Sequence, residues 1–181
     1  MRRSTAATLA MTCMGTIAGV AAFVQPPVAA EAPRDARATT SVVADQLSAG
    51  TATGKRAAAS RYSRQAHKAT NNRRGDHGLR ALRRTDCVQR YAVRQAKAMA
   101  RQTEMYHQEL GPILEDCQLN LVGENVAYGY RTGRSVVNDG WMNSEGHRAN
   151  ILNPAFKLMG IAARKGHDGS WYVSQVFGRK G

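Results

Sequence analysis

The sequence predicts an α+β protein in which helices surround a small antiparallel sheet. Apolar residues recur at steps of three and four between Val88 and Ala100, which is the spacing of one face of a helix. Two later runs, 158–164 and 171–177, alternate in their apolar residues, and the turn sequence 166–169 separates them. This pattern is typical of an antiparallel hairpin. Helices around a few antiparallel strands form a layered α+β domain.

The first 30 residues predict a secretory signal peptide. Arg2 and Arg3 form a charged start, residues 9–24 carry no charge, and Ala29-Ala30 supply the small residues that a signal peptidase accepts. An uncleaved membrane anchor is the alternative, but threonines and glycines interrupt the apolar run. We therefore expect a secreted, extracellular protein.

Residues 31–60 predict a disordered linker. They are mainly Ala, Thr, Ser, Gly and Arg, and such a segment cannot bury enough apolar surface to offset the entropy of ordering. We therefore expect three parts: a signal peptide over 1–30, the linker over 31–60 and a folded domain over 61–181.

The cysteines predict one disulfide bond. Cys13, Cys87 and Cys117 lack the Cys-x-x-Cys spacing of a zinc ribbon. Removal of the signal peptide would take Cys13 away and leave a pair in an oxidising compartment, where such pairs usually bond. Two separate free thiols are the alternative, and we expect the bond.

The charge balance predicts anionic partners. The formal net charge is +13 at pH 7, which favours binding to an anionic cell-envelope polymer or lipid surface. Arg90, Arg94, Lys97 and Arg101 lie opposite the apolar face of the predicted helix, as either a solvated surface or a polyanion-binding one. Aromatic residues do not interleave with them, so we do not expect nucleic acid as a partner.

Helices are expected on both sides of residue 80. Apolar residues at 62, 66 and 69 share one helix face, which the glycines at 75 and 78 end. Thr85-Asp86 is suited to cap a longer helix, and Gln89 stands three residues beyond Asp86, in the position of a capping box. Residues 119–127 then predict a strand and the start of a helix at 123–125, where Glu124 either caps backbone amides or points into a site.

The stretch 140–154 concentrates the features of a site. A helix capped by Ser135 is expected to deliver Trp141, a large apolar anchor. Ser144 is suited to cap a second short helix, with Glu145 in its first turn and His147 close behind. Asn153-Pro154 then ends this helix.

Four motifs together resemble the CAP superfamily, the SCP or pathogenesis-related-1-like domain, in its short bacterial secreted form. They occur in the family's order and cover about residues 61–181; they are His107, the run 123–127 (Gly-Glu-Asn-Val-Ala), Trp141 with 144–152, and the run 171–178. The resemblance implies an α-β-α sandwich around a central cleft.

The resemblance also implies which residues line the cleft. Many eukaryotic members hold two histidines and two glutamates there, sometimes with a divalent metal. His107, Glu124 and His147 match the first histidine, the first glutamate and the second histidine. The second glutamate is missing, because Ser144 stands at its position and Glu145 follows one residue later.

The expected cleft residues would suit more than one kind of site. His107, Glu124 and His147 would suit a divalent metal such as zinc with an open coordination position, or they form a hydrogen-bonded structural network. Asn125, beside Glu124, is included among the expected cleft residues. Ser144 near His147 suggests a serine-type hydrolase, although the G-x-S-x-G turn is absent from that position.

The function we expect is binding rather than catalysis. The ligand would be a small apolar molecule, such as a lipid, or an anionic component of the cell surface, and the protein would be a monomer. A metal-assisted or serine-type hydrolase acting in the same cleft is the alternative.

Overall fold

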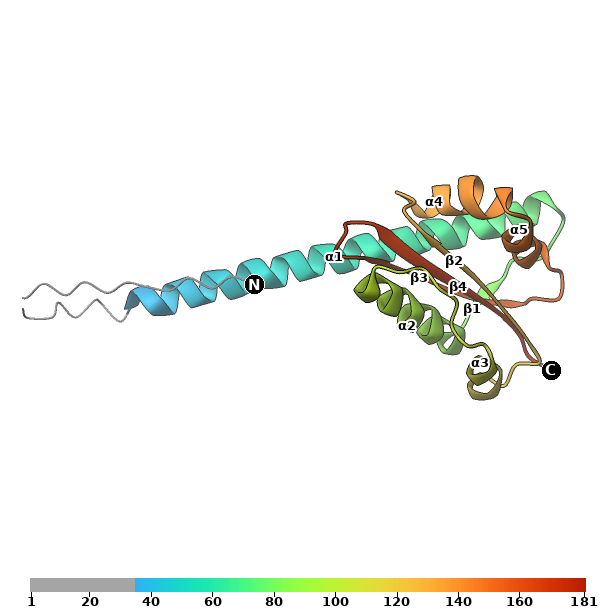
Figure 1. Ribbon diagram of the computed structural model, residues 1–181, viewed down its shortest axis with the longest axis horizontal. Helices are drawn as coiled ribbons and strands as arrows, with labels where there is room; N and C mark the ends of the chain where they lie inside the picture. The colour runs from blue at the N-terminus through green and yellow to red at the C-terminus, as the bar shows by residue number, and fades with distance from the viewer. Residues whose placement is uncertain (1–34) are drawn as a thin grey trace, which may run out of the picture.

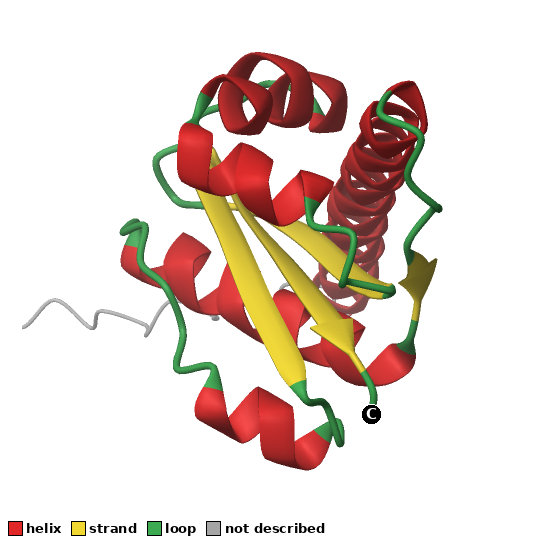
Figure 2. Ribbon diagram, turned by 90° about the vertical axis from the view of Figure 1, so that its right-hand side faces the viewer, coloured by secondary structure: helices red, strands yellow, loops and turns green. Residues whose placement is uncertain are grey.

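The computed structural model describes residues 35–181, so the signal peptide expected over 1–30 lies outside the described residues. The described chain is an α+β protein built as an α-β-α sandwich, with a four-stranded sheet between two layers of helices (Figure 1). One face of the sheet is covered by the long helix α1 and a run of short helices; these are α1 (Asp35–Asp76), α4 (Gly133–Ser135), η1 (Val136–Gly140), η2 (Trp141–Asn143) and α5 (Glu145–Leu152). The other face is covered by α2 (Asp86–Gln102) and α3 (Gly111–Asp116). Figure 2 shows the sheet between the two layers, seen from one end.

The sheet has the strand order β1-β3-β4-β2. Its strands are β1 (Arg83–Arg84), β2 (Leu121–Tyr128), β3 (Leu158–Lys165) and β4 (Trp171–Arg179). The expected antiparallel hairpin is β3–β4, whose turn places Gly169 at a positive φ of 79° that glycine adopts without strain. The short β1 pairs in parallel with β3, which makes the sheet mixed rather than wholly antiparallel.

The helix start expected at 123–125 is wrong. Strand β2 runs straight through these residues and pairs with β4 from Leu121↔Arg179 to Tyr128↔Tyr172. The Gly-Glu-Asn sequence resembles a helix start locally, but the long-range pairing with β4 provides backbone hydrogen bonds along the whole segment. Because β2 is extended, Glu124 and Asn125 point to opposite faces of the sheet.

Helix α1 is much longer than expected. It begins at Asp35, so the described part of the expected linker is helical rather than disordered. This segment is rich in alanine, the residue with the highest helix propensity. Side chains from Ser48 to Ala57 are exposed, and from Ser48 onward Ala59 is the first buried residue of the helix. The N-terminal half of α1 projects beyond the sheet (Figure 1). Within residues 35–181, none of the helices combines the length and apolar character needed to cross a membrane.

Helix α2 packs as its sequence predicts. Its buried side consists of the expected stripe, Val88, Tyr91, Ala92, Gln95, Ala96, Met99 and Ala100. Gln89 does not form the expected capping box, because its side chain bonds the backbone N–H and C=O of Ile161 on β3. At Gly160 a Cβ atom would lie 2.5 Å from the α2 backbone, so a glycine is required for this close approach.

The segment before Trp141 changes helix type instead of forming one regular helix. Thr132, rather than the expected Ser135, is the N-cap, and the two side chains form a reciprocal capping box. A three-residue α-helical turn then leads into the π-helical η1 and the 3₁₀ η2. Trp141 is 1% exposed, which confirms its expected role as an anchor.

The expected disulfide bond joins the two helices on one face of the sheet. Cys87 lies in the first turn of α2, and Cys117 follows the last residue of α3. Their sulfur atoms are bonded, and their Cα atoms are 5.6 Å apart. The bond therefore attaches the short α3, which has few buried residues of its own, to the longer α2.

Removal of this bond tests its contribution to stability. The bonded cysteines are 30 residues apart in the sequence, and a loop of that size stabilises the folded state by about 2–4 kcal/mol. The double variant Cys87→Ser/Cys117→Ser is expected to lower the free energy of unfolding in urea by this amount. Reduced wild-type protein should lose a similar amount, whereas an unchanged denaturation midpoint in both would contradict the prediction.

Candidate functional site

The site lies at the edge of the sheet formed by β2, where both helical layers are attached. On one side, the Trp141 indole donates a hydrogen bond from Nε1 to the carbonyl oxygen of Val126, at 3.1 Å. Helix α5 follows and begins after Ser144, as predicted, although the Ser144 hydroxyl makes no capping bond. The sequence thereby places His147 in the first turn of α5, near β2.

The carboxylate of Glu124 is the centre of a hydrogen-bonded cluster. Its side chain is 1% exposed. His107 Nδ1 lies 2.9 Å from Oε2, and the backbone amide of Gln108 donates to the same oxygen at 3.2 Å. The other oxygen, Oε1, accepts from Gln108 Nε2 at 2.6 Å and from the Ser174 hydroxyl at 2.9 Å. Glu124 therefore caps a backbone amide and also reaches one of the predicted cleft histidines.

Asn125 belongs to a second network on the opposite face of the sheet. Its Nδ2 donates to the backbone carbonyl of His147 and to Gln175 Oε1, both at 3.2 Å. Its Oδ1 accepts from Asn150 Nδ2 at 3.0 Å, and Gln175 in turn donates to the Thr70 hydroxyl on α1 at 2.9 Å. This network ties α1 and α5 to the sheet through buried amide groups.

The two predicted cleft histidines differ in environment. His107 is 58% exposed, while His147 is half-buried. Burial of the ring, followed by its electrostatic coupling to nearby His107, lowers the pKa of His147 below its usual value. His147 is therefore neutral at pH 7, and it contacts the Asn125 network through its backbone rather than through its ring.

Glu124 itself has little capacity to ligate a metal ion. Within residues 35–181, no group of three or more His, Cys, Asp or Glu side chains is placed to hold one. The two carboxylate oxygens of Glu124 offer about four lone-pair positions, and four donors already occupy them. The bond from His107 Nδ1 to Glu124 leaves the Nε2 atom of that ring outside the cluster, which is how carboxylates orient metal-binding histidines, so metal binding through the histidines stays a prediction.

The serine hypothesis also lacks the required geometry. A nucleophilic serine needs a base within hydrogen-bond reach, and the described residues contain no hydrogen bond between Ser144 and His147. Glu145, which follows Ser144, is exposed in the first turn of α5 and does not join the Glu124 cluster.

The residues that complete both networks were not predicted from the sequence. Gln108, Asn150, Ser174 and Gln175 supply most of the partners of Glu124 and Asn125. Each of them lies next to or inside a stretch already singled out. Their polarity inside strand or helix patterns was the available signal, but the partner of each one depends on the register of β2 with β4.

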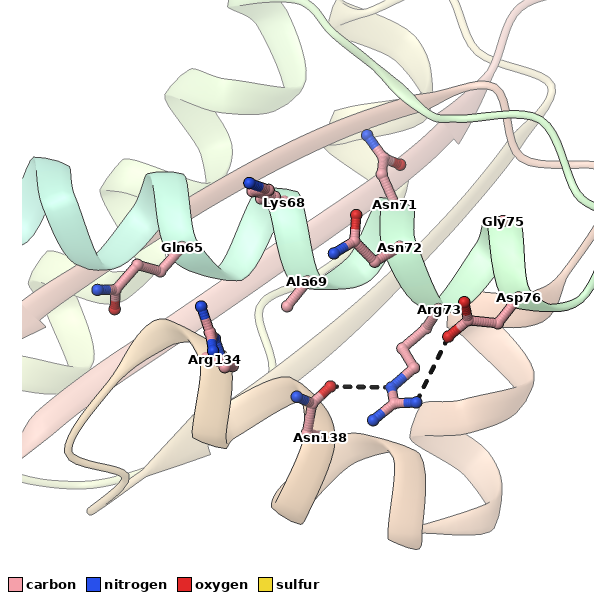
Figure 3. A pocket seen from close by; sticks show the side chains of 10 residues that line it. All are labelled: Gln65, Lys68, Ala69, Asn71, Asn72, Arg73, Gly75, Asp76, Arg134 and Asn138. Carbon is pink, nitrogen blue, oxygen red and sulfur yellow. Dashed lines mark hydrogen bonds and ion pairs between the residues drawn. The ribbon is translucent and has the colours of Figure 1, made fainter.

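Two grooves lie elsewhere on the surface. The first, about 660 Å³, runs between the C-terminal part of α1 and the α4–η1 segment (Figure 3). It has a mostly polar lining, in which Arg73 donates to Asn138 at 2.9 Å and pairs with Asp76 at 3.4 Å. The second, about 1240 Å³, is bounded by α1, α2 and the β3–β4 hairpin. His107, Glu124 and His147 line neither groove.

Comparison with known proteins gives consistent matches. The cysteine-rich secretory protein family, CAP, matches residues 67–177. The uncharacterized protein YkwD of Bacillus subtilis is 30% identical over 138 residues, which are 71% of this chain and 52% of that relative. The chain thus spans about half the length of this curated relative.

Solved structures agree with this match. An extracellular protein of Bacillus anthracis containing an SCP domain is 29% identical, with a TM-score of 0.59, over 67% of this chain and 41% of that one. An outer surface protein of Borrelia burgdorferi shares the fold, with a TM-score of 0.57 and 24% identity, over 64% of this chain and 90% of that one. The family match, the relatives and the sandwich fold agree, and the chain belongs to the cysteine-rich secretory protein (CAP) family.

Proposed function

We propose that this CAP domain is a secreted, non-catalytic module that binds an anionic component of the cell surface. The observation that carries this proposal is the charge of the domain. Residues 61–181 contain 20 lysines and arginines against 10 aspartates and glutamates. Arg90, Arg94, Lys97 and Arg101 are all exposed on α2, which supports a surface that attracts polyanions.

The hydrogen bonding of Glu124 supports binding over hydrolysis. A general base needs a free lone pair facing its substrate. The Glu124 carboxylate is buried and accepts from His107, Gln108 and Ser174 instead. Its arrangement therefore suits a structural connection between β4, β2 and the loop before α3.

The grooves favour an anionic ligand over a small apolar one. Polar side chains, including Lys68, Arg73 and Arg134, dominate the lining of the first groove. Seven lysine and arginine side chains line the second, around a surface that is otherwise largely apolar. A purely apolar ligand would have to displace water from these charged groups without replacing their interactions, which costs free energy.

Export of this chain is part of the proposal. The N-terminal sequence has the charged start and apolar run of a signal peptide. The Bacillus anthracis relative, at 29% identity, is described as extracellular. An anionic envelope polymer or lipid headgroup would then be within reach of the mature protein.

Salt dependence of binding tests the proposal. The protein is expected to bind phosphatidylglycerol vesicles or an anionic envelope polymer at low salt. The affinity should fall at least about tenfold between 50 and 200 mM salt, because binding releases counterions from the polyanion and added salt opposes that release. Co-sedimentation measures this, with phosphatidylcholine vesicles as the neutral control. The proposal fails if no anionic partner is bound at low salt.

The Glu124 cluster gives a second prediction. In Glu124→Gln the new amide nitrogen cannot accept hydrogen bonds, so at least one donor of the cluster loses its partner. Leaving such a buried group unpaired costs about 1–3 kcal/mol of unfolding free energy. Urea denaturation measures this loss, and Glu145→Gln on the exposed start of α5 is the control, expected within about 0.5 kcal/mol of wild type.

A catalytic role for Glu124 would give a different result. Glu124→Gln would then keep wild-type stability and abolish an activity. Equal stabilities of Glu124→Gln, Glu145→Gln and wild type would contradict the structural role assigned to this carboxylate.

A further inference from the structure

The groove between α1, α2 and the β3–β4 hairpin carries a concentrated positive charge. Its cationic side chains come from three of its walls: Lys55, Arg56 and Arg64 on α1, Lys97 on α2, Arg164 and Lys165 on β3, with Arg84 on β1. Among the residues that line it in the described chain there is no aspartate or glutamate. In the adjoining turn, the Asp168 carboxylate accepts from the Ser170 amide and the Tyr172 hydroxyl.

We propose that this groove is the binding site for a linear phosphodiester polymer without bases, of the polyol-phosphate kind. The proposal rests on the proposed function and names the ligand class and the site. Most of the seven cationic side chains are exposed, and none pairs with a carboxylate among the described ion pairs. Their charge is therefore available to a ligand.

The length of the groove favours a polymer over a single anion. Its α1 wall extends from Gly54 to His67, a span of about 20 Å at the rise of an α-helix. Arg56 and Arg64 alone are separated by about 12 Å along this helix. A single phosphate group can meet only a few of these cations, whereas a chain with repeated phosphates can satisfy more of them at once.

The shape of the site favours a chain in a groove over a flat membrane. The cations come from α1, α2 and the β3 strand, and the same lining includes the apolar side chains of Val93, Ile161 and Ala162. A flat lipid surface would contact only the rim of such a groove. A polyol-phosphate chain has both parts that this lining suits, charged phosphates for the cations and CH and CH₂ groups for the apolar side chains.

Nucleic acid fits less well because bases need stacking surfaces. Single-stranded nucleic acids bind by stacking on aromatic side chains as well as by phosphate contacts. Trp171 supplies the largest ring of the lining, and it already packs on Tyr62 at a centroid distance of 5.0 Å, while the smaller rings are those of half-buried His67 and exposed His167. A base-free polymer uses the charges without requiring stacking.

Two variants with equal losses of charge test the site. The groove variant is Arg56→Gln/Arg64→Gln/Lys165→Gln, and the control is Arg80→Gln/Arg131→Gln/Lys180→Gln, at exposed positions outside both grooves and outside α2. All six residues are exposed, so both variants should fold, which circular dichroism and thermal melting can verify. The probe is fluorescently labelled polyglycerol phosphate, and binding is followed by anisotropy over a series of salt concentrations.

The groove variant is expected to bind at least about tenfold more weakly than wild type. Its slope of log K against log salt should be shallower by about 2, which is about 0.7 for each of three lost phosphate contacts. The control should stay within about threefold of wild type, and orthophosphate should bind at least about tenfold more weakly than the polymer.

Other outcomes would overturn the inference in distinguishable ways. Equal losses in the two variants would mean that the whole surface binds, so the groove assignment fails while the proposed function stands. The wild-type protein could instead bind a single-stranded oligonucleotide or phosphatidylglycerol vesicles more tightly than the polymer, with the same loss in the groove variant. That result would refute the polymer as the ligand of the groove. If the wild-type protein binds none of the anionic probes, both the proposed function and this inference fail.

Discussion

The pairing of β2 with β4 is the constraint on which the site depends. β2 is the edge strand of the sheet, and its register places Asn125 opposite Gln175 and Glu124 opposite Val176. Neighbouring residues of a strand point to opposite faces, so a shift of one residue would exchange the two side chains. Glu124 would then face the α1–α5 layer and Asn125 the loop before α3, and both networks would lose their partners.

A buried arginine holds the helical layer that carries His147. Arg74, near the end of α1, is 1% exposed and has no carboxylate among its recorded partners. Its guanidinium instead donates to the backbone carbonyls of Arg80, Ile151 and Asn153, at 2.7–2.9 Å. Carbonyls at the end of a helix lack partners within it, and a cation there is favourable. Arg74 thus satisfies the end of α5 and fixes that helix against α1.

Local patterns in the sequence predicted the helices and strands that the spacing of their own apolar and capping side chains identifies. The buried stripe of α2, the β3–β4 hairpin and the start of α5 after Ser144 all follow from the spacing of their side chains. β2 was partly misjudged, because residues 123–125 resemble a helix start and only the distant β4 makes them a strand. The same limit applies to Gln89, whose partner on β3 lies 72 residues away.

The site residues, too, could be predicted from the sequence while most of their partners could not. His107 and Glu124 could be named from the sequence, and the structure brings them together at 2.9 Å. Whether Glu124 had a free lone pair could not be predicted, because that depends on Gln108 and Ser174, which reach it from a loop and from another strand. In α1, the helix propensity of residues 35–60 outweighed their lack of buried apolar surface. This segment was expected not to fold alone, and it extends a helix whose later turns are packed on the sheet.

The two kinds of charged group in this protein have opposite energetics. The buried carboxylate of Glu124 is stabilised within the protein, and exchanging its four donors for a ligand would cost free energy. The cations of the α1–α2–hairpin groove repel one another in the free protein, and that repulsion opposes the folded arrangement. Under the proposed function, a polyanion entering the groove would remove this repulsion and add attraction, and it would therefore stabilise the folded chain on binding. On this proposal a ligand would gain more free energy in the groove than by competing for the bonded carboxylate of Glu124.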